Sequence, residues 1–224
     1  MIERFALTAD MEEVAVRFGV RQVMSEQGNR FNVAPTQTAS IIMNDRHDRR
    51  VLQESRWGLF PFWAKDAINT DHDTLGEKPF LHRMLKTQRC VIPCSGFYGQ
   101  KMIGKERDPR AMYTTVPTQP LLAIAGFYDS WRHFGGREER AFTMLTAASA
   151  GHMSAWQPKV PIILDEDGVE EWLNPKEREF SRLRKHLEPL EGYLTRSYPV
   201  TNAVHDEQYE SPDCVLEISI GDFA

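Results

Sequence analysis

A few side chains in this chain have the type and spacing that could do chemistry. Cys90 and Cys94 form a Cys-x-x-x-Cys pair that could offer two thiolates to a metal, but no second ligand pair lies at a helpful spacing. If residues 90–94 form a strand, alternation places both thiols on one face, which favours packing in a core. With Cys214 as the third cysteine, the sequence indicates neither a disulfide framework nor a metal centre.

His72 lies between two carboxylates, Asp71 and Asp73, and such a triplet could bind a metal ion or orient the imidazole as a base. Consecutive side chains on an extended strand point to opposite faces, so the three would converge only in a loop. We expect a solvated loop here and no metal. His152 and Ser154 lack the Gly-x-Ser-x-Gly spacing of a nucleophile elbow, so they indicate no hydrolase site.

The elements that must position any site are mostly short strands. Apolar and alternating runs predict strands at 2–8, 39–43, 49–57, 88–92, 121–128 and 141–147. Helical spacing and capping residues predict a helix from Thr8 or Asp10 to Phe18, and further helices at 78–86, 168–173 and 176–187, the last capped by Asn174. With no alternation of strands and helices, this pattern indicates the α+β class, a curled and mostly antiparallel sheet closing toward a barrel with peripheral helices.

Composition sets broad limits on domain count and compartment. The chain has 224 residues and carries no repeat or linker, so we expect a single domain over 1–224. No apolar run approaches the roughly 18–20 residues that span a bilayer, and charged residues interrupt the N-terminus where a signal peptide would be apolar. We therefore expect a cytoplasmic protein with no membrane segment.

The formal net charge of −5 argues against wholesale attraction to nucleic acid but leaves room for a local basic groove. Three basic clusters stand out, namely Arg46, Arg49 and Arg50, then Arg83, Lys86 and Arg89, then Lys101, Lys105, Arg107 and Arg110. Each cluster taken alone is typical of a solvated surface.

Four strings point to one family by their order and separation. They are NVAPTQ at 32–37, WGLFPFWAKD at 57–66, CVIPCSGFY at 90–98 and VPIIL at 160–164. In this order the chain resembles the SOS response-associated peptidase (SRAP) family, the abasic-site processing proteins, from Arg4-Phe5 to the segment 197–200. The resemblance implies an SRAP-like fold, no cofactor, and covalent protection of abasic sites in single-stranded DNA during the DNA-damage response.

The resemblance also implies a mechanism. An N-terminal cysteine, freed by loss of the initiator methionine, offers an amine and a thiol on adjacent carbons. The amine attacks the ring-opened aldehyde of the abasic site to give an imine, and the thiol closes a thiazolidine ring on that imine. Asn, Glu and His groups orient the sugar and move protons, while aromatic and proline side chains support the splayed strand.

The positions that the resemblance makes catalytic hold other residues here. Ile2 stands at the cysteine position, Gly99 at the glutamate position and Gln157 at the histidine position, while Asn69 is retained. Ile2 has no nucleophile and, because it is bulky, we expect it to leave Met1 uncleaved. Gln157 can donate and accept hydrogen bonds but cannot titrate near neutrality.

The DNA-binding positions match better. The resemblance carries over to Arg4, Pro35, Trp63, Asn69 and Lys159. Trp63 could stack on a base, worth roughly 1–3 kcal/mol, or be a core or turn aromatic. Asn69 could instead fix a loop through side-chain-to-backbone hydrogen bonds. Asp71 stands where the family has a DNA-contacting arginine, which exchanges attraction to a phosphate for repulsion.

Three hypotheses follow. The first is an SRAP-fold protein that associates with abasic or single-stranded DNA and cannot form the thiazolidine cross-link. The second is an abasic-site lyase that uses the α-amine of Met1, whose ordinary pKa of about 7.7–8.0 permits imine formation. The third is a non-catalytic protein-interaction module, which the acidic net charge and Asp71 favour.

Overall fold

The computed structural model describes residues 2–61, 64, 66–102, 109–132, 138–189 and 191–219. The strands are β1 Phe5–Leu7, β2 Gln22–Val23, β3 Arg30–Val33, β4 Thr38–Asn44, β5 Arg50–Trp57, β6 Asn69–Asp71, β7 Arg89–Cys94, β8 Gly96–Lys101, β9 Arg110–Thr115, β10 Leu122–Arg132, β11 Glu138–Ala148, β12 Lys159–Pro161, β13 Ile163–Leu164 and β14 Arg196–Pro199. The helices are α1 Met11–Phe18, α2 Pro79–Thr87, α3 Glu166–Leu173 and α4 Phe180–Arg184.

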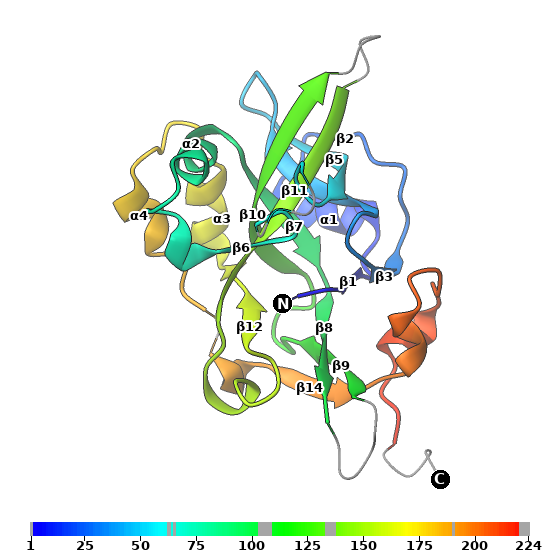
Figure 1. Cartoon of the computed structure of the whole chain (residues 1–224). Coiled ribbons are helices and arrows are strands. Elements are labelled where there is room, and N and C mark those ends of the chain that lie inside the picture. Colours follow the sequence, from blue (N-terminus) through cyan, green and yellow to red (C-terminus); the bar gives the residue numbers. More distant parts are fainter. Residues whose placement is uncertain are drawn as a thin grey trace.

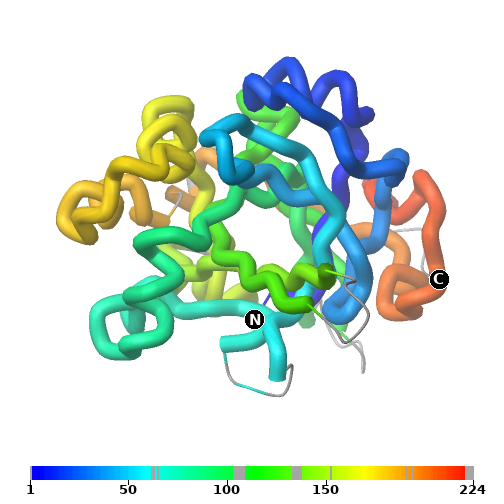
Figure 2. Tube along the Cα trace, turned by 90° about the horizontal axis from the view of Figure 1, so that it is seen from above, coloured from blue at the N-terminus to red at the C-terminus, as the bar shows by residue number. Residues whose placement is uncertain are grey.

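Five strands close into a small barrel, seen end-on in Figure 2. Strand β4 pairs with β5 and β7, β7 with β10, and β10 with β11, all antiparallel, and the parallel pairing of β11 with β5 completes the ring. The strands around β10 pack closely, because a Cβ at position 126 would lie 2.4 Å from Ile92 Cδ1 and 2.6 Å from the Thr143 carbonyl oxygen. Gly126 is therefore required for this approach. The predicted α+β fold with a mostly antiparallel sheet closing toward a barrel is confirmed.

Apolar side chains fill the barrel. Trp57 is fully buried, packs edge-on against Phe5 at a ring-centroid distance of 5.2 Å, and stacks on Phe142 at 6.2 Å. Cys90 and Cys94 are buried in the same cluster, as the predicted core packing requires. Burial raises the pKa of the Cys94 thiol to about 12, which keeps it protonated at neutral pH.

A second sheet carries the start of the chain to the barrel. Its strands lie in the order β14-β9-β8-β1-β3 (Figure 1). Strand β8 follows β7 after a single residue, Ser95, whose backbone N–H donates to the Ala6 carbonyl at 2.7 Å. Tyr98 and Tyr113 from this sheet pack with Val204 of the C-terminal segment in a separate buried cluster. The N-terminal strand is thereby fixed next to the end of β7.

Helix α1 begins where the sequence predicts. Asp10 caps it, accepting the Glu13 N–H at 2.8 Å while the Glu13 carboxylate accepts the Asp10 N–H at 3.1 Å, which is a capping box. Helices α2, α3 and α4 cover the outer face of the barrel (Figure 1), and Trp172 of α3 donates its indole N–H to the Cys90 carbonyl at 2.9 Å. Within the described residues, every helix is too short or too polar to cross a bilayer.

The helix predicted over 176–187 is wrong in its first half. Asn174 does not cap it, because its Oδ1 atom accepts the Lys176 N–H at 3.0 Å in a turn and α4 begins later. The buried guanidinium of Arg89 donates to the carbonyl oxygens of Asn174 and Glu177, at 2.6 Å and 2.9 Å. These carbonyls therefore bond to a side chain from a distant strand, which a local sequence pattern does not reveal.

Candidate functional site

The candidate site surrounds the first residues of the chain, between β6 and β8. Asn69 donates its side-chain N–H to the Ile2 carbonyl at 2.8 Å, and the Tyr98 N–H donates to the Arg4 carbonyl at 3.0 Å. The Ile2 side chain is fully buried in the cluster that fills the barrel. Position 2 therefore contributes packing, and it presents no nucleophile to a bound ligand.

Asn69 is held by two backbone segments, the Ile2 carbonyl that its side chain contacts and the strand β11 that pairs with β6. Its strand β6 pairs in parallel with β11, which places Asn69 beside Met144. Its side-chain Oδ1 atom is buried and has no hydrogen-bond partner among the described residues. This atom is an unpaired, buried acceptor next to the start of the chain, at a position that the sequence predicted to be both catalytic and DNA-binding.

Gly99 and Gln157 fit each other. A Cβ at position 99 would lie 2.2 Å from Gln157 Oε1 and 2.9 Å from Trp156 Cζ3. The Gln157 side chain is only 3% exposed, and its Nε2 atom donates to the Lys159 carbonyl at 2.8 Å. The Gln157 amide thus fills the space that any side chain at position 99 needs. Residues 99 and 157 are therefore packed against each other as one local unit.

This fit predicts coupled stabilities. Gly99→Ala is expected to lower the free energy of unfolding by about 1–3 kcal/mol because overpacking displaces Gln157 or Trp156. In a Gln157→Ala background the same change should cost much less, so urea denaturation of the four proteins would give non-additive free energies. Gly28→Ala is the matched control, since no atom lies within 4 Å of the added Cβ. Additive effects would contradict the fit.

Asp71 and Lys159 form an ion pair at this site. The Lys159 ammonium lies 2.6 Å from Asp71 Oδ2. Partial burial acts to raise the pKa of the Asp71 carboxyl, but hydrogen bonding and the charge of Lys159 outweigh it and hold that pKa below its ordinary value. The Asp71 carboxyl is therefore ionised at neutral pH. The sequence suggested that Asp71 is an isolated charge that repels phosphate. In the structure its charge is paired with the Lys159 ammonium, which is therefore not free.

The carboxylates of Asp71 and Asp73 converge on His72, which the sequence allowed only if the segment leaves the extended conformation. One ligand atom from each residue lies within 4.8 Å of the others, and His72 Nε2 is 3.4 Å from Asp73 Oδ1. Strand β6 ends at Asp71 and residues 72–74 form a 3-10 turn, so alternation does not apply. Asp71 Oδ2 is paired with Lys159, while Asp71 Oδ1 lies 3.7 Å from His72 Nδ1, so Asp71 contacts both neighbours.

A pocket of about 260 Å³ opens beside Gly99. Its polar lining includes Glu3, Arg4 and His205, and Trp156 forms part of the wall. The Arg4 guanidinium donates to the His205 carbonyl at 2.8 Å and to Asn32 Oδ1 at 3.2 Å. Burial, followed by the charge of Arg4, lowers the pKa of the His205 imidazole, so this ring is neutral at neutral pH. Arg4 therefore lines the pocket and also connects the N-terminal segment to Asn32 and His205 through hydrogen bonds.

The remaining predicted positions lie elsewhere. Pro35 is half-buried in the turn between β3 and β4 and does not line this pocket. Trp63 and Met1 fall outside the described residues. Sequence reasoning missed Trp156 and His205 as pocket residues. The adjacency of Trp156 to Gln157 was a usable signal, whereas His205 reaches the site through a contact with Arg4 that spans 201 positions.

Comparison with known proteins identifies the family. The model of the SOS response associated peptidase (SRAP) family matches residues 1–207, so this chain belongs to that family. The abasic site processing protein YoqW of Bacillus subtilis is 31% identical over 226 residues, covering 96% of this chain and 99% of YoqW. The abasic site processing protein HMCES of Gallus gallus is 26% identical, covering 85% of this chain and 67% of HMCES.

The fold is shared with solved structures. A crystal structure of a protein from Bacteroides thetaiotaomicron superposes with a TM-score of 0.79 at 23% identity, covering 96% of this chain and 99% of that one. A phage-related protein from Bordetella bronchiseptica gives 0.72 at 21% identity, covering 88% and 93%. These two likenesses show that nearly the whole chain shares its fold with solved structures.

Proposed function

We propose that this protein binds abasic sites in single-stranded DNA without forming a thiazolidine cross-link. The observation that carries the proposal is the state of position 2, where the resemblance implies a catalytic cysteine. Ile2 has no nucleophile, and its side chain is fully buried in the barrel interior. The relatives named abasic site processing proteins supply the ligand class, and they match this chain over nearly its full length.

The neighbouring groups support recognition better than chemistry. The pocket beside Gly99 offers the Arg4 guanidinium and the aromatic face of Trp156 next to the first residues, which suits a splayed sugar and phosphate. Gln157 forms hydrogen bonds there but supplies no proton transfer near neutral pH. Gly99 supplies neither an acid nor a base. A bound abasic site would therefore be held, with no group at these positions to drive its conversion.

A binding assay tests this proposal. Fluorescence anisotropy is measured with a labelled single strand carrying one tetrahydrofuran abasic analogue, with the same strand intact, and with the corresponding duplex. The analogue cannot form an imine, so only non-covalent affinity is read. We expect the abasic single strand to bind best and its affinity to fall as salt rises. No binding at low salt, or equal binding to the duplex, would contradict the proposal.

The ion pair at Lys159 gives a directional prediction. Asp71→Asn is expected to strengthen binding to the abasic single strand by about three- to tenfold at low salt, the order expected for one added phosphate contact. The change releases the Lys159 ammonium and removes a negative charge from the site. Asp73→Asn is the control, because Asp73 is exposed and forms no ion pair with Lys159. The anisotropy assay reads both variants, and unchanged or weaker binding by Asp71→Asn would refute this role for the pair.

A further inference from the structure

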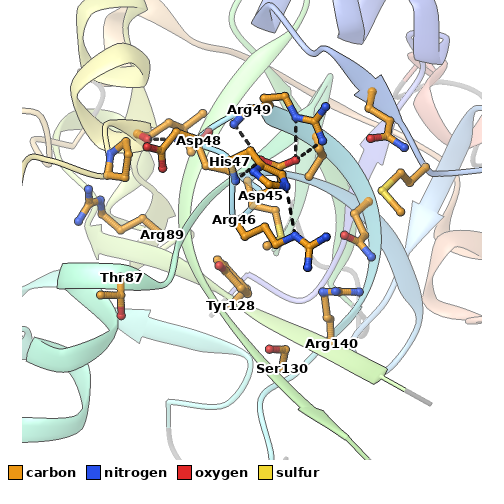
Figure 3. A pocket seen from close by; sticks show the side chains of 18 of the residues that line it. Asp45, Arg46, His47, Asp48, Arg49, Thr87, Arg89, Tyr128, Ser130 and Arg140 are labelled. Atoms are coloured by element: carbon orange, nitrogen blue, oxygen red, sulfur yellow. Dashed lines mark hydrogen bonds and ion pairs between the residues drawn. The ribbon is translucent and has the colours of Figure 1, made fainter. Parts of the chain in front are cut away.

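A second and larger pocket lies at the other end of the barrel. The candidate functional site, called the SRAP site below, lies beyond the carboxyl end of β7, along β8 near Gly99. The larger pocket instead surrounds the amino end of β7 at Arg89. The turn between β4 and β5, the end of β10 and the start of β11 frame it (Figure 3). Its volume is about 760 Å³. It is therefore separate from the site described above.

Cations that are scattered in the sequence converge on this pocket. Arg46 and Arg49 come from one basic cluster of the sequence, and Lys86 and Arg89 from another. The strands β10 and β11 add Arg132 and Arg140, and Arg178 joins them from the segment before α4. Figure 3 shows Arg46 and Arg140 around the same opening as Tyr128 and Ser130. Taken alone, each sequence cluster is typical of solvated surface, but together they line one hollow.

Only some of these cations are neutralised. Arg49 pairs with Asp45 at 2.7 Å, and Arg140 pairs with Glu138 at 2.8 Å. Arg89 is occupied by backbone carbonyls, including that of Asn174. These three cations therefore contribute structure more than free charge.

Four cations of the lining remain. No described carboxylate forms an ion pair with Arg46, Lys86, Arg132 or Arg178, and Arg46 donates only to His47 Nε2 at 3.2 Å. Of the three carboxylates in the lining, Asp48 is the one without an ion pair among the described residues. The hollow thus presents a surplus of positive charge in a chain whose overall net charge is −5.

The pocket also has an aromatic wall. Tyr128 lines it half-buried, next to the hydroxyl-bearing Ser130, and both come from the same strand β10. Its volume lies within the range of about 300–1,000 Å³ that small-molecule sites occupy. Guanidinium groups suit phosphate, and an aromatic face suits a planar base.

We propose that this pocket binds a nucleoside phosphate, either free or as part of a nucleic-acid strand. Arg46 and Arg132 hold the phosphate, and Tyr128 contacts the base. This inference does not depend on the proposed abasic-site function, because it uses none of the residues of that site.

Isothermal titration calorimetry at low salt tests the proposal with ATP, with inorganic pyrophosphate and with a ten-nucleotide single strand lacking abasic sites. We expect saturable binding of ATP or of the strand, weakened at least tenfold in Arg46→Gln/Arg132→Gln. Arg184→Gln is the matched control, an exposed arginine outside the pocket, and should bind as the wild type does. Tyr128→Leu should weaken ATP binding and leave pyrophosphate binding unchanged.

The three probes distinguish a free nucleotide from a nucleic-acid strand as the ligand of this pocket. Arginine-dependent binding of ATP alone assigns a free nucleotide, and arginine-dependent binding of the strand alone assigns a strand contact. No saturable binding of any probe, or equal binding by the double variant, overturns the proposal, and an inert Tyr128→Leu overturns its base contact. The double variant should still bind the abasic single strand through the SRAP site, so failure here is distinguishable from failure of the proposed function.

Discussion

Ile2→Ala is expected to lower the free energy of unfolding by about 2–5 kcal/mol, the range for truncating a buried isoleucine or leucine. The side chain is fully buried and packs in the cluster that contains Phe5 and Trp57. The backbone of Ile2 is held by Asn69, so the chain start cannot easily collapse into the space that truncation leaves. Urea denaturation monitored by tryptophan fluorescence measures the change.

The control for this prediction is Val16→Ala. Val16 is 79% exposed on α1, so its truncation should change stability by no more than about 0.5 kcal/mol. If Ile2→Ala proved equally harmless, position 2 would not be part of the core. The region would then be open to a ligand. The proposal that this protein forms no thiazolidine cross-link would lose the support of a buried side chain at position 2.

A variant carrying Ile2→Cys, Gly99→Glu and Gln157→His together is expected to change from no covalent reaction to a stable adduct with abasic single-stranded DNA. A small residue at position 2 permits removal of Met1, which places an amine and a thiol on adjacent carbons. The Glu and His side chains then supply proton transfer. The changes at 99 and 157 must be made together, because a side chain at 99 meets the Gln157 amide in the native structure.

The control is a triple variant that carries a hydroxyl in place of the thiol, that is Ile2→Ser with Gly99→Glu and Gln157→His. It should lose the initiator methionine but form at most an imine, which survives denaturation only after borohydride reduction. Intact-mass spectrometry verifies Met1 removal in both variants and Met1 retention in the wild type. A folded cysteine variant that has lost Met1 and still forms no adduct would show that these three positions do not suffice.

Local sequence patterns predicted the barrel strands and α1 because each depends on neighbours along the chain. The capping box at Asp10 and the apolar runs of β4, β7 and β10 are of this kind. The first half of the helix predicted at 176–187 failed because the buried guanidinium of Arg89, from β7, bonds to its carbonyls. No local pattern reports such a contact.

The sequence offered candidate site positions, but it did not show how their side chains are arranged. The sequence presented Gly99 and Gln157 as two separate positions, and only the fold shows that the Gln157 amide fills the space beside the Gly99 backbone. The sequence predicted that Asp71 is a repulsive charge, because its partner Lys159 lies 88 positions away and no local pattern shows the pair. The second pocket could not be predicted from the sequence either, because its cations come from five separate parts of the chain that only the fold brings together.

The most direct test of the central claim is a denaturing gel of the wild-type protein incubated with single-stranded DNA carrying one natural abasic site, with and without borohydride. Intact DNA is the control strand. An adduct only with borohydride would assign a transient imine, most simply at the Met1 amine, and would favour the lyase hypothesis. We predict no band of protein-linked DNA in the absence of reductant. A denaturant-stable adduct without reductant would contradict the account, because a covalent route would then operate without a nucleophile at position 2.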